Sequence, residues 1–241
     1  MAALARLDSS SLRVGAAECL FESMRSLFQL SVQKAAGIAA LGTAIACYPR
    51  LALWLNRPGP LWTVWLILLW SAFMLWAFVF AWHEKYTGQK VFVFQIQPAL
   101  WGVASICGLC GAALLYFTVD PTLRQLAPSE YPHTVAEWGA MTLFALAFDQ
   151  LCVCFAPLAF FSRLVPKRNI AVVLTVLFGT FVLSLKLNTI PNVPLSLSAT
   201  IILLRMASSY LSVAFYLRGG ALVTWWWILL LHSRHLILLP C

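Results

Sequence analysis

Long uncharged apolar runs constrain this chain more than any other feature of its sequence. Leu61–Trp82 is a run of 22 residues without a charged side chain, and Gln97–Val119 is a second uncharged run. A helix needs about 20 apolar residues to cross the hydrocarbon core, and in lipid its backbone groups must bond within the segment. Only 10% of the residues are charged, against about 25% in soluble domains. The chain is therefore predicted to be an all-α, multi-pass integral membrane protein.

The apolar segments predict a polytopic transmembrane helical bundle of about seven spans. They are Ala35–Leu55, Leu61–Trp82, Gln97–Val119, Val135–Phe161, Ile170–Leu185, Val193–Tyr216 and Ala221–Leu239. The first is interrupted by Tyr48-Pro49-Arg50, so we expect either a kinked span or a re-entrant pair of half-helices. Lys186 follows the fifth segment, and we expect its side chain to reach back to the interface.

Two regions differ in composition. Residues 1–34 are mixed and polar, and Leu12–Leu30 carries apolar residues at helical spacing. This pattern predicts an amphipathic segment over 1–34 that lies on the membrane surface. Residues 35–241 form the predicted transmembrane helical domain.

The net charge of +8 does not indicate nucleic-acid binding. The sixteen Lys and Arg residues are scattered near the ends of apolar runs, with no long basic stripe. This placement is typical of side chains that face lipid headgroups. The loops 83–96, 162–169 and 216–220 carry more basic than acidic residues, whereas the loop 120–134 does not. We expect the three basic loops and the N-terminus on the inner side, with the C-terminus outside.

Ionisable residues inside apolar segments are the candidate functional residues, because each is costly at membrane depth. Asp149 is followed by Gln150, Arg205 lies mid-span, and His232 and His235 come late in the last segment. We interpret them as structural intramembrane polar residues, with Asp149 paired to Arg205 or to a histidine. If the site is catalytic, Asp149 and His232 would carry it as a carboxylate activating water beside a histidine.

The remaining metal and pigment patterns are weak. His232 and His235 could be axial ligands of a buried haem or chlorophyll, but nothing else in the sequence specifies a pigment. Cys107-Gly108-Leu109-Cys110 lies mid-span, where buried cysteine usually acts as a small apolar residue. We therefore predict no cofactor and no metal.

A phrase near the end of the chain carries a family resemblance. Tyr216-Leu217-Arg218-Gly219-Gly220-Ala221-Leu222 leads through three tryptophans to His232. This phrase resembles the last motif of the CAAX-prenyl-endopeptidase and bacteriocin-processing membrane proteases (CPBP, also called ABI). Asp149-Gln150 lies upstream, where that family has two adjacent glutamates, then three variable residues and an arginine. Phe181–Leu185 lies where the family has Phe-x-x-x-His. The resemblance implies a CPBP-like fold for the C-terminal half, and a site at which a glutamate and histidines activate water.

The departures from that family imply a degenerate site. Asp149-Gln150 replaces the glutamate pair, and Cys154 stands in place of the arginine. Leu185 stands in place of the second-motif histidine, and Leu236 in place of the final Asn or Asp. The resemblance thus implies a fold more than an activity.

These observations favour a non-enzymatic membrane subunit or scaffold. We expect it to pack against other integral membrane proteins and lipids in a larger complex, for which the eleven Trp residues offer apolar contact surface. One alternative is a CPBP-type intramembrane protease that acts on lipidated or membrane peptides. A second is a small transporter or channel, for which the break at Pro49 is the only sign of a discontinuous helix.

Overall fold

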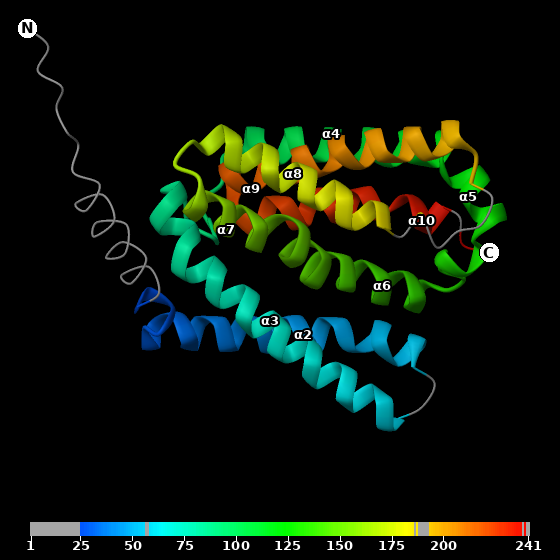
Figure 1. The fold of residues 1–241 in the computed structure, drawn as a ribbon. Helices are drawn as coiled ribbons and strands as arrows, with labels where there is room; N and C mark the ends of the chain where they lie inside the picture. The colour runs from blue at the N-terminus through cyan, green and yellow to red at the C-terminus, as the bar shows by residue number, and fades with distance from the viewer. Residues whose placement is uncertain (1–24, 56–57, 186, 188–192, 238, 240–241) are drawn as a thin grey trace, which may run out of the picture.

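The protein is an all-α, multi-pass membrane protein. The computed structural model describes residues 25–55, 58–185, 187, 193–237 and 239. Within them, six helices are long and apolar enough to cross a membrane. They are α2 (Leu30–Trp54), α3 (Pro58–Thr87), α4 (Pro98–Thr118), a composite helix over Val135–Leu164, α8 (Arg168–Leu185), and α9 (Leu195–His232) with its extension α10 (Arg234–Ile237). Figure 1 shows them as one bundle.

The predicted apolar segments are confirmed as helices. Leu61–Trp82 lies inside α3, and Gln97–Val119 coincides with α4 to within one residue at each end. The helix α2 is continuous from Leu30 through Pro49 to Trp54, which agrees with a single span and not with two re-entrant halves. Most of the predicted interfacial segment 1–34 lies outside the described residues, as does Lys186.

The helix α9 is folded back on itself at Gly220, whose φ of 67° and ψ of −166° are not helical. The indole Nε1 of Trp227 donates to Ser212 Oγ across the turn at 3.2 Å, and the rings of Trp227 and Phe215 lie 5.7 Å apart. In both pairs the two residues lie at similar distances along the chain on either side of Gly220. The two arms of α9 therefore run antiparallel (Figure 1). The arms correspond to the predicted segments Val193–Tyr216 and Ala221–Leu239.

The turn at Gly220 is fixed to the connection between α3 and α4. Phe92 and Gly220 form an antiparallel bridge, and the amide of Ala221 donates to the carbonyl of Val91 at 2.9 Å. Arg168, at the start of α8, lines the same groove as Gln89 and Arg218. The loops 83–96, 162–169 and 216–220 therefore lie at one end of the bundle, as their charges predicted, and the N-terminal end of α2 lies there too (Figure 1).

The core is built from small residues beside large aromatic ones. Ala36, Ala40 and Ala72 are fully buried, which lets α2 and α3 approach closely. Trp76 is buried next to them, and its indole donates to Thr43 Oγ1 at 2.9 Å. Large apolar side chains also cover much of the outer surface. In a membrane protein this surface faces lipid, so it needs no protein partner for burial.

Candidate intramembrane site

The composite helix changes its hydrogen-bond pattern where the candidate acid lies. It begins as α6 (Val135–Phe144), passes through two π-helical segments, η2 (Ala145–Asp149) and η3 (Leu151–Phe155), and ends as α7 (Ala156–Leu164). The amide of Gln150 bonds to the carbonyl of Ala145, five residues back. In such a segment, residues five apart share a face, and π-segments are frequent at functional sites. This repeat puts Asp149 and Cys154 on one side of the helix.

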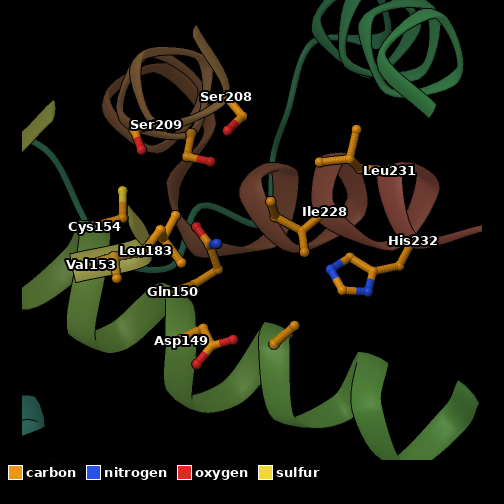
Figure 2. Close-up of a pocket in the computed structure, with 12 residues that line it drawn as sticks. Asp149, Gln150, Val153, Cys154, Leu183, Ser208, Ser209, Ile228, Leu231 and His232 are labelled. Atoms are coloured by element: carbon orange, nitrogen blue, oxygen red, sulfur yellow. The ribbon is translucent and has the colours of Figure 1, made fainter. Parts of the chain in front are cut away.

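That side of the helix faces a small cavity of about 120 Å³. Ala145, Asp149, Gln150, Val153 and Cys154 line it from the π-segments. The opposite wall comes from α8 and from both arms of α9, which contribute Leu183, Ser208, Ser209, Ser212, Ile228, Leu231 and His232 (Figure 2). The volume is enough for more than one water molecule. The cavity thus lies between apolar helices and has both polar and apolar side chains in its lining.

A close backbone approach brings α8 to this wall. A Cβ at Gly179 would lie 3.0 Å from the carbonyl oxygen of Val153 and 3.3 Å from Ser209 Oγ. Glycine thus lets α8 pack directly on the π-segment and on the first arm of α9. Leu183, one turn further along α8, then lies in the cavity.

A larger cavity of about 610 Å³ continues from the small one. The two share Asp149, Leu183, Ser208, Leu231 and His232. From there the larger cavity passes Arg205 and His235 and reaches Asp120 and Tyr131 at the far end of the bundle, with α4 as its other wall. Its lining is mostly apolar, with polar groups at a few points.

All five predicted polar residues belong to this pair of cavities. Asp149, Gln150 and His232 line the smaller one, and Asp149, Arg205, His232 and His235 line the larger one. Asp149 lines both cavities between the helices, and its direct bond to Arg205 or to a histidine stays a prediction. Several buried polar atoms have no hydrogen-bond partner among the described residues, including Arg205 Nη1, Gln150 Oε1 and His232 Nδ1.

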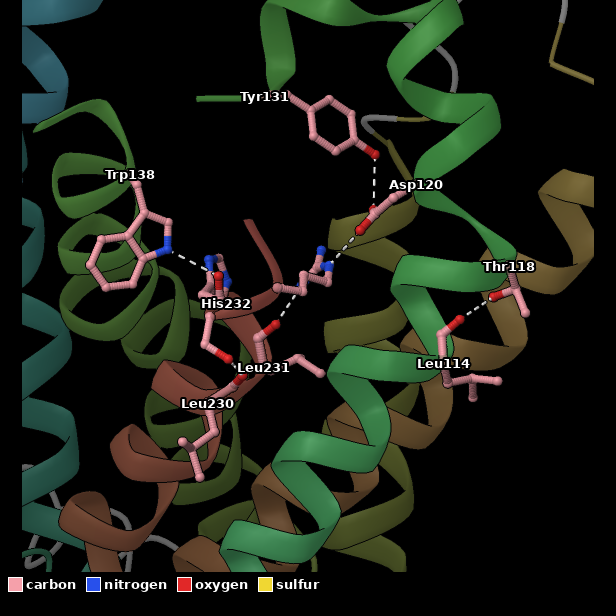
Figure 3. Close-up of polar contacts among 10 residues, drawn as sticks. Leu114, Thr118, Asp120, Tyr131, Trp138, Leu230, Leu231 and His232 are labelled. Atoms are coloured by element: carbon pink, nitrogen blue, oxygen red, sulfur yellow. Dashed lines mark hydrogen bonds and ion pairs between the residues drawn. The ribbon is translucent and has the colours of Figure 1, made fainter. Parts of the chain in front are cut away.

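Sequence reasoning missed the ion pair that closes the far end. Arg234 Nε donates to Asp120 Oδ2 at 3.0 Å, and the Tyr131 hydroxyl donates to Asp120 Oδ1 at 2.9 Å (Figure 3). The Asp120 side chain is only 3% exposed. Burial, and then the charge of Asp120, raise the pKa of Tyr131, so its phenol stays a donor. Asp120 lies in the loop predicted over 120–134. The one sequence feature that could have indicated its position is the dipeptide Asp120-Pro121, which is typical of a helix start.

The same end of the bundle fixes the position of His232. The indole Nε1 of Trp138 donates to the carbonyl of His232 at 3.0 Å (Figure 3). The rings of His232 and His235 lie 5.8 Å apart, and the ring of Tyr131 lies 5.4 Å from that of His235. Trp138 on α6 and Tyr131 therefore hold the end of the second arm, and with it the imidazole of His232 that lines the smaller cavity.

The positions implied by the family resemblance fall on two different surfaces. Cys154 is buried and lines the smaller cavity. Leu185 and Leu236 are 48% and 40% exposed, and neither lines either cavity. The residue of α8 that lines the smaller cavity with Asp149 and His232 is Leu183, and Leu185 is not part of this lining (Figure 2). The sequence match at Phe181–Leu185 therefore points to a lipid-facing row of α8.

The described residues contain no group of three or more His, Cys, Asp or Glu side chains that could hold a metal ion. Cys107 and Cys110 are free thiols and lie in the α4 wall of the larger cavity. No protein-family model, curated protein or solved structure matches this chain.

Proposed function

We propose that this chain is a non-enzymatic subunit or scaffold of a membrane complex, and that its larger cavity receives part of a partner membrane protein. The observation that supports the proposal is the buried guanidinium nitrogen Nη1 of Arg205, which has no hydrogen-bond partner among the described residues. Arg205 is also one of the residues that line that cavity. An arginine at mid-membrane costs about 2.5–3.5 kcal/mol on insertion scales. A carboxylate or backbone carbonyl from a partner helix would offset this cost.

The proposed fold of the C-terminal half is a CPBP-like core that has lost its catalytic residues. The support is that Asp149 and His232 line one cavity, as the resemblance implies for an acid and a histidine. Cys154 and Leu183 line it beside them, and neither supplies the fixed positive charge or the imidazole of the family pattern. A missing oxyanion donor can reduce a rate by about 10²–10³. Such a lining suits binding better than hydrolysis.

The proposed topology has seven crossings, because each arm of α9 counts as one. The N-terminus would lie on the inner side with the basic loops. Cysteines introduced at Lys90 and Lys167 should then react from the inner side, and one at Glu130 from the outer side. Labelling of all three from the same side would contradict this topology.

Site-specific cross-linking in the native membrane tests the scaffold proposal. A photoreactive residue at Leu204 would project into the larger cavity, whereas one at its neighbour Leu203, which is exposed, would face lipid. We expect discrete protein adducts from Leu204 and lipid adducts from Leu203. The variant Arg205→Gln should reduce the Leu204 adducts. Lipid adducts alone from Leu204, or protein adducts that do not depend on Arg205, would overturn the proposal.

A second candidate is an intramembrane protease, which is favoured by the presence of Asp149 and His232 in one cavity with room for water. The purified parent, Asp149→Asn and His232→Ala should be compared on prenylated and membrane-peptide substrates. The scaffold proposal predicts no cleavage by any of them. Cleavage by the parent that both substitutions abolish would replace it with the protease.

A further inference from the structure

A separate groove of about 630 Å³ opens at the basic end of the bundle. Its walls are the connection between α3 and α4, the first turns of α4, the start of α8 and the end of the first arm of α9. The polar part of its lining consists of Arg168, Arg218 and the amides of Gln89, Gln95 and Gln97. We propose that this groove binds the headgroup of an anionic phospholipid.

The charge of the groove favours a phosphate. Arg168 and Arg218 come from different helices, both are exposed, and no carboxylate of the described residues lines the groove with them. Arg168 is also the first residue of α8, whose first turn contains no acidic residue. A helix N-terminus carries partial positive charge, so a cation there is unfavourable until an anion binds. Guanidinium groups match phosphate oxygens in a bidentate geometry.

The apolar part of the groove favours a lipid over a soluble phosphate. Leu100, Val103 and Leu217 line it next to the arginines. Val103 is 50% exposed, and Ile106, one turn further along α4, is exposed on the outer surface. The groove thus passes from a cationic mouth onto an apolar strip of α4. A phospholipid has a phosphate and acyl chains in this same order.

The position of the groove agrees with the proposed topology. The loops 83–96, 162–169 and 216–220 around it carry six basic residues against one acidic residue, and anionic lipids attract basic segments at the cytoplasmic leaflet. Four of these six cations, among them Lys85, lie outside the groove, as does Lys34 near the start of α2. They offer a matched control, because removing them changes the net charge of this end without changing the groove lining.

Native mass spectrometry of the full chain in mild detergent tests the site. Phosphatidylglycerol and phosphatidylcholine would be added at matched concentrations to the parent, to Arg168→Gln/Arg218→Gln and to Lys34→Gln/Lys85→Gln. We expect the arginine pair to lose affinity for phosphatidylglycerol by about thirtyfold, from about fivefold for each charge. The lysine pair should retain the parent preference, and so should Arg168→Lys/Arg218→Lys in large part.

Three outcomes would overturn the proposal. Parent-like binding by the arginine-to-glutamine pair would show that the groove is not the site. An equal loss of affinity for phosphatidylglycerol in Lys34→Gln/Lys85→Gln would show that the preference comes from general surface charge. Competition by glycerol phosphate as strong as that by phosphatidylglycerol would identify a soluble phosphate as the ligand.

Discussion

The turn at Gly220 should tolerate no side chain, and the substitution Gly220→Ala tests the packing that unites both arms of α9. The backbone of Gly220, with φ 67° and ψ −166°, lies in a region that is essentially restricted to glycine. A Cβ at this position would lie 2.6 Å from the carbonyl oxygen of Val91 and 3.1 Å from the amide of Val93. Both contacts are to backbone atoms, so a side-chain rotation cannot relieve them.

The expected loss of stability has two contributions, the backbone conformation of residue 220 and the steric clash of its Cβ. Holding alanine in this conformation costs about 1–3 kcal/mol. Separating the chains to relieve the clash would also break the bond from the Ala221 amide to the Val91 carbonyl, a loss of about 0.5–1.5 kcal/mol. We therefore expect Gly220→Ala to lower the free energy of unfolding by about 2–4 kcal/mol.

Substitutions at two other glycines separate the conformational contribution from the steric one. A Cβ at Gly88 meets nothing within 4 Å, but its φ is +70°, so Gly88→Ala tests conformation without a clash. A Cβ at Gly102 also meets nothing, and this residue lies inside α4. Unfolding in mild detergent should rank the losses as Gly220→Ala, then Gly88→Ala, with none for Gly102→Ala. If Gly220→Ala falls within about 0.5 kcal/mol of Gly102→Ala, the range of neutral surface changes, the reasoning is refuted.

Three further predictions concern the larger cavity. Asp120→Ala removes one partner of a buried ion pair with Arg234 and should lower the free energy of unfolding by about 3–5 kcal/mol; a loss no larger than that of the exposed Glu84→Ala would contradict this. Because the pKa of Tyr131 is raised above its ordinary value of 10.0 in the folded protein, its contribution is complete below about pH 10 and is lost as the pH rises toward the folded pKa. Unfolding measured from pH 9 to 11 should therefore show a smaller alkaline loss in Tyr131→Phe than in the parent, and equal losses would disprove the effect. Arg205→Leu should leave the isolated protein as stable as the parent or more so, because Nη1 is buried without a partner; a large loss of stability would mean that Arg205 is already paired within this chain.

The helices could be predicted because each apolar run is as long as the membrane requires. The turn of α9 was also visible in the sequence, since Gly219-Gly220 separates two runs. The π-segments were not. Val135–Phe161 is apolar on every side, so it has no polar stripe whose period would reveal a change in hydrogen bonding. The hydropathy pattern therefore predicted that Asp149 and Gln150 lie in a span, and only the family resemblance placed Cys154 at the same site.

The burial of polar residues near the helix ends was also not predicted from the sequence. His83 follows the last residue of an apolar run and precedes Glu84, which is typical of a loop. In the structure α3 continues to Thr87, and His83 is fully buried, with its ring 4.4 Å from that of Tyr216. The burial comes from the first arm of α9, more than a hundred residues away in the chain. A pattern of local hydropathy contains no information about such a contact.

The same limit decides how the site on α8 should be interpreted. A motif of the form Phe-x-x-x-His fixes a spacing of four residues, and both Phe181–Leu185 and Gly179–Leu183 have that spacing. In the structure Phe181 and Leu185 are exposed on the lipid-facing surface, whereas Gly179 contacts the π-segment and Leu183 lines both cavities. The residue that α8 presents to Asp149 and His232 is a leucine in either alignment, and its side chain can neither bind a metal nor donate a hydrogen bond. The polar side chains of the smaller cavity thus come from the π-helical region and α9, and Arg205, also on α9, lines the larger cavity. This arrangement favours a site that receives a polar group from a partner over one that completes a hydrolytic centre by itself.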